Sequence, residues 1–180
     1  MPAGKRTMSV KERITEALCR LIEEKKVPYQ ELSIQQIVSE AEVCRNSFYR
    51  NFTSKDDILL KMFEKARQEG DVAFRNNPDQ TMHGLLTSLI ETYRNNRRFL
   101  LCFYKANPNI YFEHIITTVI QSNTEEKLEN ISPAEYYTFA GRAWLPIGIM
   151  TEWIKRDCDL PVEELVTLIE RWNIISPPGV

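Results

Sequence analysis

The stretch Ser33–Lys55, SIQQIVSEAEVCRNSFYRNFTSK, decides how the N-terminal third of this 180-residue chain folds. Ser33 and Gln36 have the spacing of a capping box, in which two side chains satisfy free backbone amides at a helix start. Apolar residues then recur from Ile34 to Ala41 at positions i, i+3, i+4 and i+7, which is the spacing of one buried helical face. The stretch therefore predicts a short amphipathic helix directly after Ser33.

A second short helix is predicted immediately downstream. The apolar pattern breaks at Glu42–Cys44 and resumes at Arg45–Phe52, where Phe48 and Phe52 lie four residues apart on one side. Two short helices joined by a turn of three or four residues form the helix-turn-helix arrangement, whose second helix enters the DNA major groove. The alternative interpretation is a helical hairpin with a solvated polar face, which the same spacing permits.

The exposed side chains of this second helix suit a protein that reads DNA. Arginine pairs with guanine edges and asparagine with adenine edges in bidentate fashion, while serine can contact either base. Phosphate oxygens fix register without specifying sequence, and they are bound by basic and hydroxyl side chains and by helix starts. We therefore expect base contacts from Arg45, Asn46 and Ser47, and phosphate contacts from Tyr49, Arg50, Lys55 and the helix start at Ser33.

The run Ala41–Lys55, A-E-V-C-R-N-S-F-Y-R-N-F-T-S-K, resembles the signature of the TetR family of transcriptional regulators, commonly written A-G-V-S-x-x-T-x-Y-x-x-F-x-S-K. The preceding stretch KERITEALCRLIEEK is similar to the first helix of that family. The resemblance implies a homodimer that binds a palindromic operator in double-stranded DNA, usually as a repressor. It also implies a second domain that encloses a small-molecule effector. The effector would shift the helix over 54–75 and so change the separation of the two recognition helices.

Two positions depart from the family signature. Glu42 stands where the family has glycine, so a left-handed backbone there would cost on the order of 1 kcal/mol. Cys44 stands where a capping serine is usual, and the loss of a cap costs about 1 kcal/mol. These departures keep a second hypothesis open, a TetR-like coactivator or protein-interaction module with weak or no operator binding. Cys44 itself fits either a small residue at a cap position or an oxidant-sensitive thiol.

Composition and charge indicate an ordinary soluble globular protein. Charged residues make up 27% and aromatic residues 10% of the chain, and the net charge is −2. Residues 1–67 carry 13 Lys/Arg against 10 Asp/Glu, whereas residues 68–180 carry 10 against 15, which fits a protein that touches DNA at one end. The four cysteines show no C-x-x-C spacing, and neither a signal peptide nor a membrane-spanning apolar run is evident. We therefore expect a cytoplasmic protein with reduced thiols and no membrane partner.

Helical periodicity and break signals predict an all-α protein of about nine helices. Capping signals at Ser9 and at Ser132 start two of the longer helices, and Pro146 predicts a kink within the second of these. We divide the chain into a helix-turn-helix DNA-binding domain, residues 1–53, and a helical ligand-binding and dimerisation domain, residues 54–180. In the second domain we expect helices over 54–75, 80–95, 97–106, 110–129, 133–156 and from 161 onward.

The second domain is rich in aromatic residues. Ligand sites between helices are largely apolar with a few polar groups, and the resemblance places such a pocket in this domain. An aromatic stripe at helical spacing is equally the pattern of an ordinary core, and this alternative stays open. The candidate pocket residues are Phe99, Phe103, Tyr104, Tyr111, Phe112 and Trp144.

The last two predicted helices carry more apolar residues than one core requires. TetR-like proteins usually dimerise through their last long helices, and a two-fold dimer matches palindromic half-sites. The alternative is that these residues pack within one protomer. The candidate interface residues are Ile147, Thr151, Ile154, Leu165, Leu168 and Trp172.

The sequence contains no pattern typical of an enzyme, a metal site or a cofactor site. His83 and His114 are its two histidines, and only Glu113 lies beside either of them. Adjacent residues do not share a helix face, so Glu113 and His114 form no ready pair. No Gly-rich phosphate loop, G-x-S-x-G or H-E-x-x-H motif is present. We therefore expect no catalytic residue, no metal and no cofactor.

Overall fold

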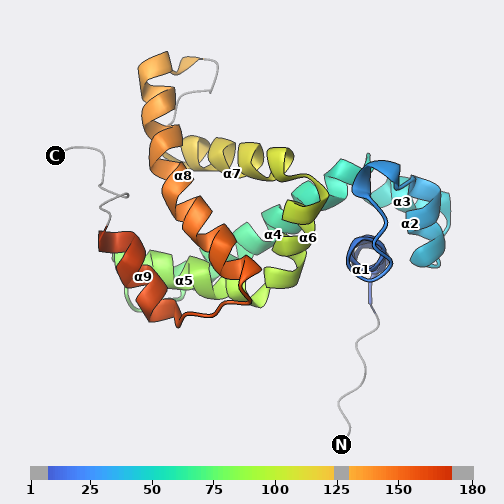
Figure 1. Cartoon of the computed structure of the whole chain (residues 1–180), viewed down its shortest axis with the longest axis horizontal. Helices are drawn as coiled ribbons and strands as arrows, with labels where there is room; N and C mark the ends of the chain where they lie inside the picture. Colours follow the sequence, from blue (N-terminus) through green and yellow to red (C-terminus); the bar gives the residue numbers. More distant parts are fainter. Residues whose placement is uncertain (1–7, 124–129, 172–180) are drawn as a thin grey trace, which may run out of the picture.

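The structure, a computed structural model, describes residues 8–123 and 130–171. Within these ranges the regular elements are helices, as predicted, and no strand occurs (Figure 1). In chain order they are α1 (Val10–Glu23), a 3-10 turn (Tyr29–Glu31), α2 (Ile34–Glu40), α3 (Arg45–Asn51), α4 (Lys55–Arg75), α5 (Met82–Asn95), α6 (Arg97–Ala106), α7 (Pro108–Asn123), α8 (Pro133–Lys155) and α9 (Val162–Arg171).

Serine caps start four of these helices. Ser9, Ser33 and Ser132 each form the complete capping box, because the serine oxygen and the acidic or amide side chain three residues on accept each other's backbone N–H. At α4 only half of a capping box forms. The Ser54 hydroxyl accepts from the Asp57 N–H at 3.0 Å, but the Asp57 carboxylate accepts from the Thr53 N–H at 2.8 Å.

The first three helices pack around one core, which we call the head (residues 8–54). Phe48 of α3 and Phe52 at its C-terminal end are fully buried, together with Ile14, Leu18 and Ile37. Burial of such side chains contributes about 1.5–3 kcal/mol each. The 3-10 turn between α1 and α2 was not predicted; there the buried Tyr29 hydroxyl donates to the Asp56 carboxylate. The head is therefore a tightly packed platform for α3.

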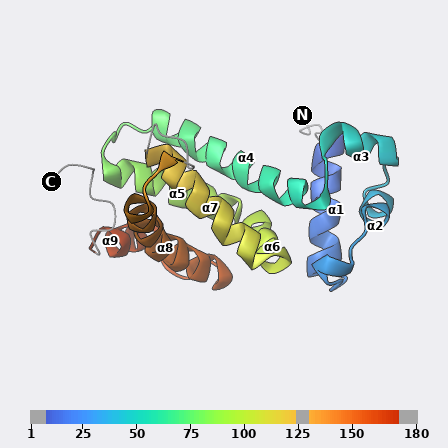
Figure 2. The ribbon, with the colours of Figure 1, turned by 90° about the horizontal axis from the view of Figure 1, so that it is seen from above.

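Helix α4 joins the head to the rest of the molecule. Figures 1 and 2 show the head at one end and α4 running from it along the remaining helices, which we call the body. Its apolar side chains Ile58, Leu59 and Met62 are buried. Phe63 lies edge-on to Tyr93 of α5 and His114 of α7, with ring centroids 6.2 and 5.2 Å apart. Farther along, a Cβ at Gly70 would lie 2.8 Å from Leu89 Cδ2, so glycine permits the close approach of α4 and α5.

Helices α5 to α9 pack with α4 to form the body. The Tyr111 hydroxyl of α7 lies 3.3 Å from the Thr151 hydroxyl of α8, and both residues are buried. At the far end, His83 of α5 lies between two carboxylates of α9, with Nε2 3.4 Å from Glu163 and Nδ1 3.2 Å from Glu170. The hydrogen bond with Glu170 and the neighbouring negative charges raise the pKa of His83.

The predicted helix boundaries in the body differ from the observed ones in a few places. Helix α7 starts at Pro108, two residues early, because proline is well tolerated in the first helical turn. Helix α8 continues through Pro146 and changes direction along its length (Figure 1). Parts of the prediction, namely residues 124–129 and Trp172, lie outside the described residues. Among the described residues no helix is both long enough and apolar enough to cross a membrane.

Candidate functional site

Helix α3 presents a polar face away from the head. Phe48 is fully buried beneath it, whereas Arg45, Asn46, Tyr49 and Arg50 are exposed. The Arg45 guanidinium lies 5.7 Å from the centre of the Tyr49 ring, and its Nη2 donates to the Tyr49 hydroxyl at 3.3 Å. Four of the seven predicted DNA contacts thus share one accessible helix surface, and two of them form a pair that holds the arginine in place.

The start of α3 is held by side chains rather than by a normal cap. Cys44 stands at the N-cap and makes no side-chain hydrogen bond to the helix backbone. Its sulfur lies 3.1 Å from the Ser47 hydroxyl, and contacts with the Ser47 side chain and N–H lower the pKa of the Cys44 thiol. Ser47 is half-buried, and its carbonyl accepts from the Asn51 side chain at 2.8 Å. Ser47 is therefore less accessible than Arg45 and Asn46, which are exposed.

The turn between α2 and α3 is a Schellman motif with glutamate in the glycine position. The Val43 N–H donates to the Val38 carbonyl at 3.0 Å, and the Glu42 N–H donates to the Ser39 carbonyl at 3.1 Å. Glu42 has a φ of 52°, in the left-handed region that disfavours side chains with a Cβ. Arg13 of α1 donates to the Glu42 carbonyl at 2.9 Å. Helix α1 thus supports the strained residue of the turn.

Lys55 occupies a different place from the one predicted. Its ammonium group donates to the carbonyls of Tyr29, Gln30 and Leu32 at 2.8, 3.2 and 3.0 Å, so its three donors end the 3-10 turn. The ammonium also lies 4.6 Å from the centre of the Tyr29 ring. Lys55 therefore has a structural role, because an ammonium group has three donors and all are used here, while the phosphate contact predicted for it stays a prediction.

Ser33 is exposed at the start of α2, as a phosphate contact requires. Its hydroxyl accepts from the Gln36 N–H at 3.2 Å and lies 2.8 Å from Gln36 Oε1, which also accepts from the Ser33 N–H at 2.9 Å. The capping box thus uses the polar groups of Ser33 internally. What α2 presents to an anion is the backbone at its first turn.

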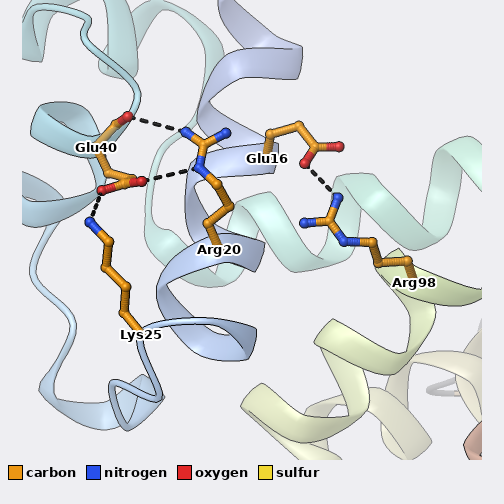
Figure 3. Close-up of polar contacts among 5 residues, drawn as sticks. All are labelled: Glu16, Arg20, Lys25, Glu40 and Arg98. Carbon is orange, nitrogen blue, oxygen red and sulfur yellow. Dashed lines mark hydrogen bonds and ion pairs between the residues drawn. The ribbon is translucent and has the colours of Figure 1, made fainter.

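Arg20 of α1 and Lys25 after its end bind the end of α2 through ion pairs. Arg20 Nε lies 3.0 Å from Glu40 Oε1, its Nη2 donates to the Glu40 carbonyl at 3.3 Å, and Lys25 binds the other carboxylate oxygen of Glu40 (Figure 3). The two cationic partners lower the pKa of Glu40. Together with Arg13 at the Glu42 carbonyl, these contacts fix the turn that sets the direction of α3.

The same helix is bound to the body by Arg98 of α6. Arg98 Nη1 donates to Glu16 at 2.6 Å, the contact drawn in Figure 3, and Arg98 Nε donates to Glu23 at 3.0 Å. Both carboxylates are largely buried, with 22% and 17% of their side chains exposed, so water screens the pairs less than at an open surface. Beside them, Cys19 of α1 and Cys102 of α6 are buried neighbours, and this contact raises the pKa of Cys19.

The six aromatic pocket candidates separate into core and surface. Phe103 and Tyr111 are buried, and Tyr111 lies edge-on to Phe103, Tyr104 and Phe112 with ring centroids 5.3–5.7 Å apart. Trp144 is 48% exposed, on the surface of α8, with its ring 5.0 Å from that of Phe112. Phe99 lines a cleft between α1 and α4. The core alternative therefore describes Phe103 and Tyr111 better than a pocket wall does.

His114 was discounted in the sequence, yet it carries an unusual polar atom. Its Nε2 is buried and has no hydrogen-bond partner. The same holds for the hydroxyl oxygen of Thr87 in α5. Burial lowers the pKa of His114, which favours the neutral imidazole. An unpaired buried polar group costs about 1–3 kcal/mol. No group of three His, Cys, Asp or Glu residues within 8–123 and 130–171 is arranged to hold a metal ion.

The predicted dimer residues mostly face the interior of the protomer. Ile147, Thr151, Ile154 and Leu165 are buried at 6, 4, 4 and 1% exposure, because α8 packs against α7 and α6 and α9 packs against α5. These four side chains therefore belong to the core that the protomer forms by itself. Of the six, Leu168 remains exposed and Trp172 lies outside the described residues. The adjoining face of α8 and α9, which we call the outer face, is lined by Trp144, Leu145, Gly148, Ile149, Leu160 and Leu168.

Two family models match the chain. The model described as bacterial regulatory proteins, tetR family, matches residues 14–62, and the model described as transcriptional regulator C-terminal region matches residues 80–173, more than half of the chain. No match was found among curated proteins.

Solved structures share the fold. A transcriptional regulator (TerR/AcrR family) from Aquifex aeolicus VF5 is 24% identical, with a TM-score of 0.53 and with 93% of this chain and 100% of that chain covered. The fatty acid degradation regulator FadR from Bacillus halodurans is 14% identical, with a TM-score of 0.60 and coverage of 94% and 97%. On the evidence of its two family matches, supported by the helix-turn-helix head, this chain belongs to the TetR family of transcriptional regulators.

Proposed function

We propose that this regulator is a repressor that binds a palindromic operator as a homodimer and is gated by a small-molecule effector. The observation that carries the proposal is the exposed face of α3, where Arg45, Asn46, Tyr49 and Arg50 stand on a rigid hydrophobic platform. A major groove admits such a helix, and the residue types match base edges and phosphates.

The side chains take different parts in this proposal. Arg45 and Asn46 read bases, with Ser47 as a lesser contributor because its hydroxyl already contacts Cys44. Tyr49, Arg50 and the first turn of α2 after Ser33 contact phosphates. Lys55 acts indirectly, since it holds the turn on which α2 begins.

The proposed dimer uses the outer face of α8 and α9. Trp144, Leu145 and Leu168 are 38–48% exposed there, and the apolar surface they form would be unusual on a free protomer. A two-fold axis through this face would relate two heads and so match two half-sites one helical turn apart.

The proposed effector acts through the body. A ligand hydrogen-bonded to the unpaired Nε2 of His114 would satisfy a buried polar atom next to Phe63 of α4. Because α4 leads directly to α3, a ligand that binds one position of α4 more tightly shifts the heads. A ligand with equal affinity for both positions would leave DNA binding unchanged.

The test is binding to the DNA upstream of the protein's own coding region, titrated against salt with a scrambled duplex as control. We expect tighter binding to the natural duplex, with log affinity falling by about 0.9 per contacted phosphate per log unit of salt. Arg50→Ala should weaken both duplexes equally, whereas Asn46→Ala should change the preferred sequence by about 1–3 kcal/mol at one base pair. Equal losses in both variants would reject the division of roles.

A second candidate function is a coactivator or interaction module with weak or no operator binding. The left-handed Glu42 and the missing cap at Cys44 favour it, because both weaken the support of α3. Binding no better than to the scrambled duplex would select this alternative, and a protein partner would then be sought.

A further inference from the structure

A cleft lies where the head meets the body. Its volume is about 460 Å³, within the range of about 300–1,000 Å³ typical of small-molecule sites. One wall is the first half of α1, the second is α4, and the third is the start of α6. Its lining includes Met8 before α1, Thr15 and Glu16 of α1, Lys61, Met62 and Lys65 of α4, and Phe99 of α6.

The walls of this junction cleft combine apolar surface with cationic groups. Met8, Met62 and Phe99 supply thioether and aromatic surface. Lys65 has 56% of its side chain exposed, and its one ion pair with a residue that the structure describes is a long 3.8 Å contact with Glu69. Lys11, also on the wall, is exposed and makes no ion pair within residues 8–123 and 130–171.

The other charges of the cleft already have partners in the protein. The carboxylate of Glu12, which also lines the cleft, accepts from the Ser9 N–H at 2.8 Å in the capping box of α1. Glu16 pairs with Arg98 at 2.6 Å. Lys61 donates to the Asn51 carbonyl at 2.8 Å and to the Asp57 carboxylate at 2.9 Å. The groups that remain to meet a ligand are therefore the two lysines, Lys11 and Lys65, which come from opposite walls.

We propose that the junction cleft binds a small amphipathic organic anion, with an aromatic or aliphatic body and one carboxylate or sulfonate, and that this binding changes operator affinity. The apolar part lies against Met62 and Phe99, and the anionic group lies between Lys11 and Lys65. The effect on DNA rests on the proposed function of the head as an operator-binding domain. This site is separate from the surroundings of His114, since it is built between head and body rather than within the body.

The position of the cleft supplies the coupling. One wall belongs to α1 of the head and the other two to α4 and α6 of the body. Any change in the position of the head therefore alters the distance of the α1 wall, which carries Lys11, from the walls that carry Lys65 and Phe99. An occupant therefore has different affinities for different head positions, which is the condition for an effect on DNA binding. Glu16 lies on the same wall as the ligand and carries the ion pair to Arg98 that holds α1 on α6.

The site is tested with 8-anilinonaphthalene-1-sulfonate, an aromatic sulfonate whose fluorescence rises on binding. Thr15→Phe places a ring in the cleft, and we expect it to raise the Kd of the probe about tenfold or more. Lys65→Gln keeps the shape but removes one charge, and we expect a rise of about threefold to fivefold. Lys105→Gln, an exposed lysine of α6 outside the cleft, is the matched control and should leave the Kd unchanged.

Operator affinity is then measured with and without the probe. We expect a change of about fivefold or more in operator Kd for the wild-type protein and none for Thr15→Phe. Equal probe binding in Thr15→Phe and the wild type would overturn the site. Weaker probe binding in Thr15→Phe and Lys65→Gln, combined with no effect of the probe on the operator Kd of the wild-type protein, would overturn the coupling. The fluorescence arm needs no DNA, so it tests the cleft even if the protein binds no operator.

Discussion

Replacement of Glu42 by glycine should stabilise the turn of the helix-turn-helix. Glu42 is held at φ 52° by the Schellman hydrogen bonds of α2 and by Arg13 at its carbonyl. The backbone contacts do not depend on the side chain, whose carboxylate is 87% exposed and 3.5 Å from Arg13. The side chain therefore adds the cost of a left-handed Cβ and returns only a weak surface ion pair.

The expected change in the free energy of unfolding follows from one stabilising and two destabilising contributions. Relief of the left-handed backbone contributes about 1–2 kcal/mol. The extra freedom of glycine in the unfolded chain costs about 0.4–1 kcal/mol, and loss of the exposed ion pair costs about 0–1 kcal/mol. Glu42→Ala loses the same ion pair but keeps a Cβ, so it is the matched control. We expect Glu42→Gly to be more stable than Glu42→Ala by about 1 kcal/mol.

Urea unfolding followed by circular dichroism measures this difference, and the midpoints should shift without a change in slope. In a thermal scan the same difference corresponds to about 2–4 °C. If Glu42→Gly is no more stable than Glu42→Ala, the left-handed conformation carries no cost at this position. The departure from the family glycine would then not weaken the support of α3.

Three further outcomes are expected. Cys44 should be alkylated by iodoacetamide faster than Cys158, because Ser47 lowers the pKa of Cys44 whereas burial raises that of Cys158. Operator DNA should slow the Cys44 reaction, and equal rates with and without DNA would mean that α3 does not contact the operator. The raised pKa of His83 means that its contribution to stability is complete below about pH 6.5 and is lost as the pH rises through the folded-state pKa, so His83→Gln should flatten the decline in urea midpoint over that interval. Gly148→Arg should give monomers in analytical ultracentrifugation while Gly148→Ala stays dimeric, because no atom lies within 4 Å of a Cβ built there and the protomer can accept either; an arginine variant that remains dimeric would move the interface elsewhere.

The sequence predicted the helices where local chemistry decides them. Serine caps at Ser9, Ser33 and Ser132 formed the expected boxes because their partners lie three residues away on the same helix. The buried spacing of Phe48 and Phe52 likewise follows from one helical turn. These are short-range patterns, and the family signature extends over the same short range.

The roles of long-range contacts were less predictable. Lys55 looked like a free cation beside the recognition helix, but its partners are carbonyls 23 to 26 residues earlier in the chain. Ile147 and Leu165 looked like surplus apolar surface, whereas α8 and α9 bury them against the rest of the body. Helical periodicity defines the two sides of a helix but leaves open which side meets the protomer core and which remains exposed. For this reason the predicted interface residues did not include Leu145 and Gly148, which lie on the outer face.

Helix α1 connects the two halves of the proposed mechanism. Arg13 and Arg20 are seven residues apart, so they share one side, and both reach the carbonyls at the end of α2. Glu16 and Glu23 have the same spacing on another side, and both accept from Arg98. We expect a helix that is bound on both sides in this way to transmit a displacement of α6 to the turn before α3, because its hydrogen-bonded backbone changes shape little. In the sequence these four residues look like an ordinary solvated surface, and their division into two rows becomes visible only when α2 and α6 are in place.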